Sequence, residues 1–261
     1  MNKETLLKIH KILYEYSIYD WIVVILVLLI GLKIDFSTFS DDFEPYFNTD
    51  INQPKRTTTI PYNYLCIITF GVGAFLVFVV WSSRKFDKSI SSVLAAYYFT
   101  ISFTIFVTCI IKKLVGRPRP DTVAVCGGQG SYHDCIKIVS KSRITDQFFS
   151  FPSGHAAEAM APSMFMTLLF VEIWKSSSMI SMSIKFLPII FALIVSISRI
   201  IDRAHHVDDV VIGLFIGGLI GFITFLTFIQ KYHTNEKHEM TDSSSIVSMS
   251  ATGVGTYNKF I

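Results

Sequence analysis

Histidine, arginine and aspartate side chains stand close together in SRIIDRAHHVDDVV, residues 198 to 211, between two long apolar runs. His205 and Asp209 are four residues apart, so on a helix they would share one face. The carboxylate could then hold one ring nitrogen of the histidine and direct the other as a nucleophile or base. Because Arg199 can bind an anion close by, the segment predicts chemistry on an anionic group.

Two further polar segments, KKLVGRPRP at residues 112 to 120 and FPSGH at residues 151 to 155, could complete a site for phosphate transfer. The first carries basic side chains for non-bridging oxygens, and the second opens a helix whose free N–H groups can bind an anion. His155 could serve as the general acid for the departing oxygen. The phosphate-binding candidates are Lys112, Arg119, Ser153, Gly154 and Arg199.

Taken singly, each feature also has a structural explanation. Basic residues at the end of a membrane span snorkel, a Pro-Ser pair caps a helix, and a lone histidine sits at a polar edge. Phosphate transfer is favoured because the three segments supply different parts of one reaction. Several charged neighbours have no assigned role: Lys113, Arg117, Glu158, Asp202, Arg203, His206 and Asp208.

The elements that would position these residues are membrane helices. The 261 residues are 51% hydrophobic and 16% charged, with a mean hydropathy of +0.49. A chain of this composition has more apolar surface than a soluble core of this size could bury. The apolar runs are long and continuous, unlike the alternating strands of a barrel. The fold class is therefore expected to be all-α, a polytopic bundle of six transmembrane helices at about 18–34, 61–83, 89–111, 155–174, 184–201 and 207–230.

The expected organisation places residues 1–17 in the cytosol, a six-span domain at 18–230, and a disordered cytosolic tail at 231–261. Lysines precede the first span and an acid-rich loop follows it, so both termini are placed in the cytosol. The three polar segments then face the lumen or the cell exterior. Glycines at 213, 217 and 221 form overlapping GxxxG steps, which predict a helix-packing face.

Four cysteines divide between spans and loops. Cys66 and Cys109 fall within spans and are expected to be packing residues. Cys126 and Cys135 share the large non-cytosolic loop, where a disulfide is an open alternative to two free thiols. No CxxC or histidine pair at ligand spacing is present, and no carboxylate cluster suggests magnesium, so no metal and no other cofactor is expected.

The three segments together resemble the phosphatidic acid phosphatase type 2 superfamily. Its pattern is Lys, six residues, Arg-Pro; then Pro-Ser-Gly-His; then Ser-Arg, five residues, His, three residues, Asp. All three elements stand in this chain with their spacings met, over a region of about residues 15 to 230. The matching residues are Lys112, Arg119, Pro120, Pro152, Ser153, Gly154, His155, Ser198, Arg199, His205 and Asp209.

The resemblance implies a metal-independent lipid phosphate phosphatase. His205 would be the nucleophile that forms a phosphohistidine, Asp209 would orient it, and His155 would be the general acid and base. Phosphatidate, lysophosphatidate or diacylglycerol pyrophosphate would arrive from the bilayer, with no nucleic-acid partner. Polyprenyl pyrophosphates, sphingoid-base phosphates and sugar phosphates remain alternative substrates, and a catalytically silent lipid-binding or transporting relative is the alternative of another class. The organelle, the preferred lipid and the oligomeric state stay open.

Overall fold

The computed structural model describes residues 5, 10, 12–13, 17–36, 51–83, 89–128, 132–140, 144, 146–176 and 178–252, with the backbone alone for 231–252. Within these ranges the chain is helical or connecting, without a strand, as the all-α prediction expects. The chain divides into two units, Met1–Phe225 and Leu226–Ile261, which are considered separately. The helices that concern the site are α2 (Ile18–Phe36), α3 (Tyr62–Cys66), η2 (Ile67–Gly73), α4 (Ala74–Ser83), α5 (Ile90–Val115), α6 (Thr122–Val125), α7 (Tyr132–Cys135), α9 (Gly154–Ile173), α10 (Met179–Ile201) and α11 (Val207–Thr252).

Five helical segments in the described part of the chain are long and apolar enough to cross a membrane. They make this a multi-pass membrane protein, but they are one fewer than the six expected spans. The remaining expected span corresponds to α2, whose 19 residues include the charged Asp20, Lys33 and Asp35. The five segments are Tyr62–Ser83, Ile90–Val115, Gly154–Ile173, Met179–Ile201 and Val207–Gln230.

Side-chain polarity in the bundle is the reverse of that in a soluble protein. Large apolar side chains cover the outward faces of the helices, as Leu29 of α2, Phe75 of α4 and Ile194 of α10 illustrate. Hydroxyl side chains on α5 point inward and are fully buried, including Thr100 and Thr104. Because lipid hydrocarbon solvates apolar side chains but has no hydrogen-bond partner for a hydroxyl group, this arrangement suits a protein surrounded by lipid.

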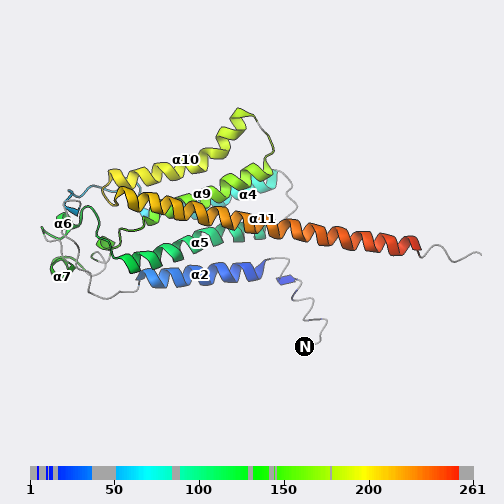
Figure 1. Ribbon diagram of the computed structural model, residues 1–261, viewed down its shortest axis with the longest axis horizontal. Coiled ribbons are helices and arrows are strands. Elements are labelled where there is room, and N and C mark those ends of the chain that lie inside the picture. Colours follow the sequence, from blue (N-terminus) through cyan, green and yellow to red (C-terminus); the bar gives the residue numbers. More distant parts are fainter. Residues whose placement is uncertain are drawn as a thin grey trace, which may run out of the picture. The chain divides into compact units, whose positions relative to one another are not determined.

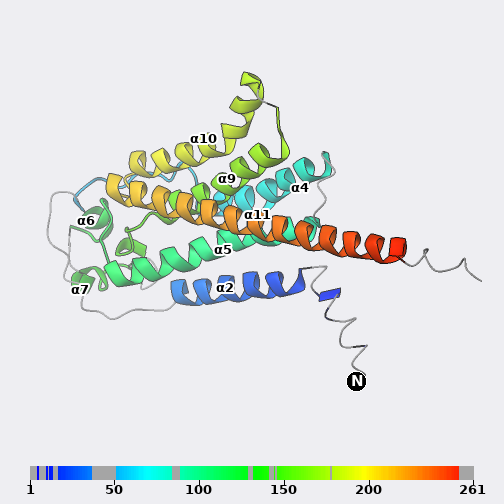
Figure 2. The same ribbon diagram turned by 45° about the vertical axis from the view of Figure 1, so that its right-hand side comes forward.

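Helix α9 occupies the centre of the first unit and packs against α5, α10 and η2 (Figures 1 and 2). The α11 glycines lie directly against its backbone. A Cβ built on Gly213 would lie 2.6 Å from the carbonyl oxygen of Ser153, and one on Gly217 would lie 2.3 Å from that of Ala157. The GxxxG steps thus form the close contact that holds the start of α11 beside the start of α9.

Replacing Gly217 with alanine is expected to lower the free energy of unfolding by about 1–3 kcal/mol, because backbone of α9 blocks the added methyl group. Thermal inactivation in detergent measures the effect. Gly218 provides the matched control, since the nearest atom to its added Cβ is Met160 Cγ at 3.7 Å. Gly218→Ala should keep or raise stability through helix propensity. Equal losses from both substitutions would refute the close contact.

Two helix boundaries differ from the expectation. Helix α10 begins at Met179, five residues before the expected 184, where Ser178 caps it by accepting a hydrogen bond from the Ser181 N–H. Helix α11 continues to Thr252, so residues 231–252 are helical where a disordered tail is expected. The serine-rich composition suggests disorder, but no glycine or proline interrupts residues 222–252, and Gly253 follows the last helical residue.

Candidate active site

The three polar segments occupy four helix ends on one side of the bundle, the side where α6 and α7 lie (Figure 1). Lys112 is in the last turn of α5, Arg199 in the last turn of α10, and Asp209 in the first turn of α11. Helix α9 begins directly after its N-cap residue Ser153. The Ser153 N–H donates to the Asp209 carbonyl oxygen at 3.0 Å, which joins the second segment to the third.

His205 is buried in the turn between α10 and α11, and its ring is held by Ser150. Nδ1 of His205 lies 2.7 Å from the Ser150 carbonyl oxygen. Since a carbonyl oxygen can only accept, Nδ1 carries the proton and Nε2 keeps its lone pair. The Nε2 lone pair of His205 is thus left without a hydrogen bond among the described residues.

Asp209 does not hold His205 in the way that the sequence suggests. Its Oδ2 atom is 3.8 Å from His205 Nδ1, beyond hydrogen-bonding distance. The carboxylate instead accepts a hydrogen bond from the Ser150 hydroxyl at 2.5 Å, so Ser150 links Asp209 to the histidine. The reason is that α11 begins only at Val207, so His205 precedes the helix and the expected shared helical face does not exist.

The Asp209 carboxylate is fully buried and receives three further contacts from its neighbours. The His206 N–H donates to Oδ2 at 2.9 Å, and His206 Nδ1 lies 3.2 Å from the same oxygen. Arg117 donates to Oδ1 at 2.7 Å and also pairs with Asp208. Arg117, His206 and Asp208, which the pattern leaves without a role, therefore fix the carboxylate that Ser150 connects to His205.

Burial lowers the pKa of His205 to about 4 from its ordinary 6.5, although the nearby Asp209 carboxylate acts to raise it. The positive charges of Arg119 and Lys112 lower this pKa further. His205 is therefore neutral at physiological pH. The contact of Arg117 with Asp209 at 2.7 Å places the first segment beside the third.

His155, in the first turn of α9, has a buried Nε2 atom with no hydrogen-bond partner among the described residues. The Tyr62 ring packs against its imidazole in a T-shaped arrangement, with 5.4 Å between the ring centroids. Electrostatic interactions connect the ring to His205 and to Arg199, Lys112 and Arg119. A buried nitrogen without a partner is costly unless a ligand uses it, so His155 is suited to meet a substrate oxygen.

Lys112 lies at the N-terminus of α9. A Cβ built on Gly154 would be 3.1 Å from Lys112 Nζ and 3.3 Å from Glu158 Oε1. Glycine at this position therefore leaves room for the ammonium group beside the first free N–H groups of the helix. A cation and aligned N–H donors together make an anion-binding site.

Arg119 is anchored in the loop that follows α5. Its Nε donates to the Asp146 carbonyl oxygen at 2.8 Å, and its Nη2 contacts the Asp146 carboxylate at 2.5 Å. The Thr122 hydroxyl donates to the carbonyl oxygen of Arg119 at 2.8 Å and lies 3.4 Å from that of Gln147. The Arg119 guanidinium is thus held at a defined position.

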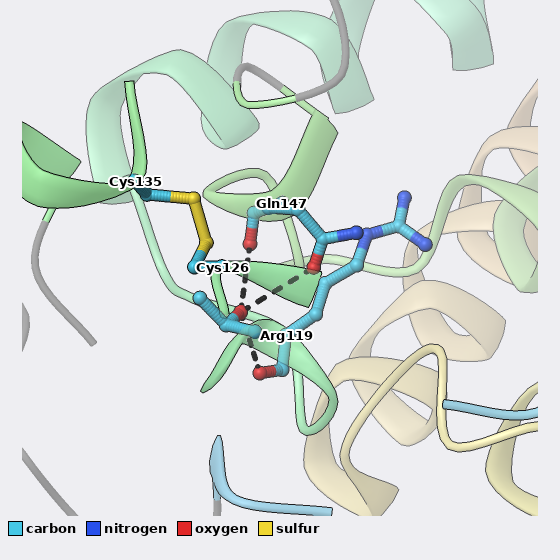
Figure 3. The surroundings of a disulfide bond; sticks show 5 residues. Arg119, Cys126, Cys135 and Gln147 are labelled. Atoms are coloured by element: carbon cyan, nitrogen blue, oxygen red, sulfur yellow. Dashed lines mark hydrogen bonds between the residues drawn. A yellow bond between two sulfur atoms is a disulfide. The ribbon is translucent and has the colours of Figure 1, made fainter. Parts of the chain in front are cut away.

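A disulfide joins Cys126 to Cys135, a pairing that the sequence leaves open, and Figure 3 shows the Arg119 guanidinium directed away from it. The disulfide belongs to a small buried cluster with Ile144 and Phe148, immediately beside Gln147. Gln147 accepts the Arg119 N–H at 2.9 Å. The disulfide therefore stabilises the loop that presents Arg119.

Arg199 is 2% exposed, and its guanidinium is held within α10. Nη2 donates to Asp202 Oδ2 at 2.8 Å and to Ser198 Oγ at 3.0 Å. Asp202, left unexplained by the pattern, is thus an ion-pair partner of Arg199. Arg203 occupies a left-handed conformation with φ 57° at the end of α10, which indicates a role in the turn.

The assembled site combines the neutral His205 imidazole, a His155 Nε2 atom without a hydrogen-bond partner among the described residues, and three cations. In the described ranges, no group of three or more histidine, cysteine, aspartate or glutamate side chains is placed to hold a metal ion. Ser150, Asp146 and Tyr62 complete the site although the pattern does not contain them. Asp146 and Ser150 lie just before the second polar segment and Tyr62 is the first residue of α3, but none of them belongs to the pattern, so residue spacing offers no signal for them.

Comparisons with known proteins agree with this chemistry. Residues 93–232, more than half of the chain, match the PAP2 superfamily. Lipid phosphate phosphatase 2 of Arabidopsis thaliana is 26% identical over 231 residues, covering 82% of this chain and 78% of the relative. Phospholipid phosphatase 1 of Rattus norvegicus is 28% identical over 259 residues, covering 88% and 91%. No solved structure matches the chain significantly.

Proposed function

Because the chain belongs to the PAP2 superfamily, we propose that it is an integral membrane phosphatase of phosphatidate, lysophosphatidate or diacylglycerol pyrophosphate. Its relatives are phosphatases by name, and this supports the reaction class. One observation carries the proposal: a neutral His205 and a His155 whose Nε2 atom has no hydrogen-bond partner among the described residues lie in one site with three cations. The substrates would reach the site laterally from the bilayer.

In the first half of the reaction, Nε2 of His205 attacks phosphorus. A P–N bond forms as the bond to the leaving oxygen breaks, and His155 donates a proton to that oxygen. The imidazole becomes positively charged as it accepts phosphorus. The hydrogen bond from its Nδ1–H to the Ser150 carbonyl oxygen stabilises that charge, and so does the nearby Asp209 carboxylate, which accepts from the Ser150 hydroxyl.

In the second half, a water molecule attacks the phosphohistidine. His155 now accepts a proton from the water, the P–N bond breaks and inorganic phosphate leaves. Lys112, Arg119, Arg199 and the N-terminus of α9 would stabilise the phosphoryl oxygens in both halves. Since these groups supply the positive charge, we propose that the reaction needs no metal ion.

The pH dependence of the reaction follows from the lowered pKa of His205. Protonated His205 cannot attack, so kcat/KM should fall as pH drops through about 4, and not at the ordinary 6.5. The profile should be measured with two substrates whose phosphate groups ionise differently. An apparent pKa that belongs to the enzyme is the same for both substrates, whereas one that belongs to the substrate changes. A shared acid limb centred near 6.5 would contradict the neutral buried histidine.

We also propose six spans, with α2 as the first and the active site facing the lumen or the cell exterior. Helix α2 packs along α5, and its outward side chains are apolar, as in the five spans. Lys3, Lys8 and Lys11 precede α2, which favours a cytosolic N-terminus. The disulfide near Arg119 suits an oxidising compartment.

The proposal is tested by measuring phosphate release from a panel of phosphates in detergent micelles, with and without EDTA. The panel should contain phosphatidate, lysophosphatidate, diacylglycerol pyrophosphate, a sphingoid-base phosphate, a polyprenyl pyrophosphate and a sugar phosphate. Turnover of a glycerolipid phosphate in EDTA is the expected result. Preference for another class would change the substrate, a magnesium requirement would refute metal independence, and no release from any member would favour a silent lipid-binding relative.

A further inference from the structure

The segment Gln53–Tyr62, termed the strap, lies outside all three polar segments yet contacts each of them. The Gln53 N–H donates to the Pro120 carbonyl oxygen at 2.8 Å, in the first segment. The Tyr62 ring packs on His155 in the second. Arg56 Nη1 donates to the Ile201 carbonyl oxygen at 3.1 Å, in the third. The strap is therefore bonded across the end of the bundle where the candidate site lies.

A fourth connection of the strap contains more hydrogen bonds than the other three and runs from Thr59 through Asp202 to Arg199. The Thr59 N–H donates to Asp202 Oδ2 at 2.8 Å, and its hydroxyl donates to Oδ1 at 2.5 Å. Arg199 donates to the same Oδ2 at 2.8 Å. Thr59 thus supplies two of the three hydrogen bonds that orient the buried Asp202 carboxylate.

Asp202 needs both partners. It is 5% exposed, and its Oδ1 accepts from the Thr59 hydroxyl alone among the described residues. Without that hydroxyl, a buried carboxylate oxygen would be left unpaired, and the carboxylate would rotate to satisfy it. Rotation would shift the Arg199 guanidinium, which is buried against Asp202 and Ser198.

We propose that Thr59 is a positioning residue that acts through Asp202 to aim Arg199 at the phosphate. This inference rests on the proposed function, because it gives Arg199 a phosphate to bind. It adds to the site a residue more than 50 positions away from any of the three polar segments along the chain.

The test compares Thr59→Val, which removes the hydroxyl at nearly constant shape, with Thr59→Ser, which retains it. The KM for the best lipid phosphate and the inhibition constant for inorganic phosphate should both rise on the order of 10-fold in Thr59→Val. Thr59→Ser should stay close to wild type. Thr58→Val is the matched control, since Thr58 is exposed and forms no hydrogen bond within the described ranges.

These readouts separate positioning from folding. A purely structural Thr59 would lower the amount of active enzyme and its thermal stability, while KM and phosphate inhibition stayed constant. In the double variant Thr59→Val/Asp202→Asn, the loss should equal that of Asp202→Asn alone, because Thr59 acts through Asp202. Unchanged KM and inhibition in Thr59→Val, or additive losses in the double variant, would overturn the inference. A wild-type enzyme that hydrolyses nothing would instead refute the proposed function.

Discussion

Replacing His205 with alanine is expected to lower phosphate release by about 10,000-fold or more, because the variant has no group that can form the covalent intermediate. The imidazole lies at the centre of the site, with Nδ1 fixed by Ser150. Water attacking directly would lack this positioning. The measurement is kcat/KM for the best lipid of the panel, with folding checked by thermal inactivation.

His206→Ala is the matched control for this substitution. It removes an adjacent imidazole that also lies near the Asp209 carboxylate, at 3.2 Å, but it leaves the backbone N–H bond at 2.9 Å in place. The expected loss is no more than about 10-fold, typical of one neutral hydrogen bond. If His205→Ala kept a tenth of wild-type activity, or if the two variants lost equal activity, His205 would not be the nucleophile.

Replacing His155 with alanine is expected to have an effect that depends on the leaving group. An alkoxide is a poor leaving group and needs the proton from His155, whereas phosphate departs from a pyrophosphate more easily. General acid catalysis contributes about 100- to 10,000-fold, so kcat/KM for phosphatidate should fall within that range. The loss for diacylglycerol pyrophosphate should be at least about 10-fold smaller.

Both substrates should be assayed with the same preparation of His155→Ala enzyme, so that misfolded protein cancels from the ratio. The comparison uses the unpartnered Nε2 atom, which the structure leaves buried beside three cations. Equal losses for the two substrates would show that His155 does not protonate the leaving oxygen. The histidine would then contribute through binding or packing.

The three segments contain most of the residues that the structure brings together at the site. Long apolar runs predict helices, and prolines after Lys112 and before Ser153 mark where those helices stop and start. Polar residues at consecutive helix ends then fall on one side of a bundle. The spacing alone thus indicated that Lys112, His155 and His205 belong to one site.

The detailed hydrogen bonds could not be read from spacing. The i,i+4 argument for His205 and Asp209 needed a helix that begins by residue 205, but α11 begins at Val207 and Ser150 fills the gap. Ser150 and Thr59 contact the site from loops, and loop contacts have no periodicity. By contrast, the apolar run at 18–34 predicts a helix, and the structure has α2 (Ile18–Phe36) there, packed against α5 with apolar outward side chains.

The most direct test of the central claim is to trap the phosphoenzyme. Enzyme mixed with ³²P-labelled lipid phosphate in EDTA would be quenched within one turnover in alkali, in which phosphohistidine survives and phosphoserine esters are lost. The result expected is label on His205, stable to base and labile to acid, and absent from His205→Ala. Label on another residue, or full turnover with no labelled protein at any time in a single turnover, would contradict the mechanism.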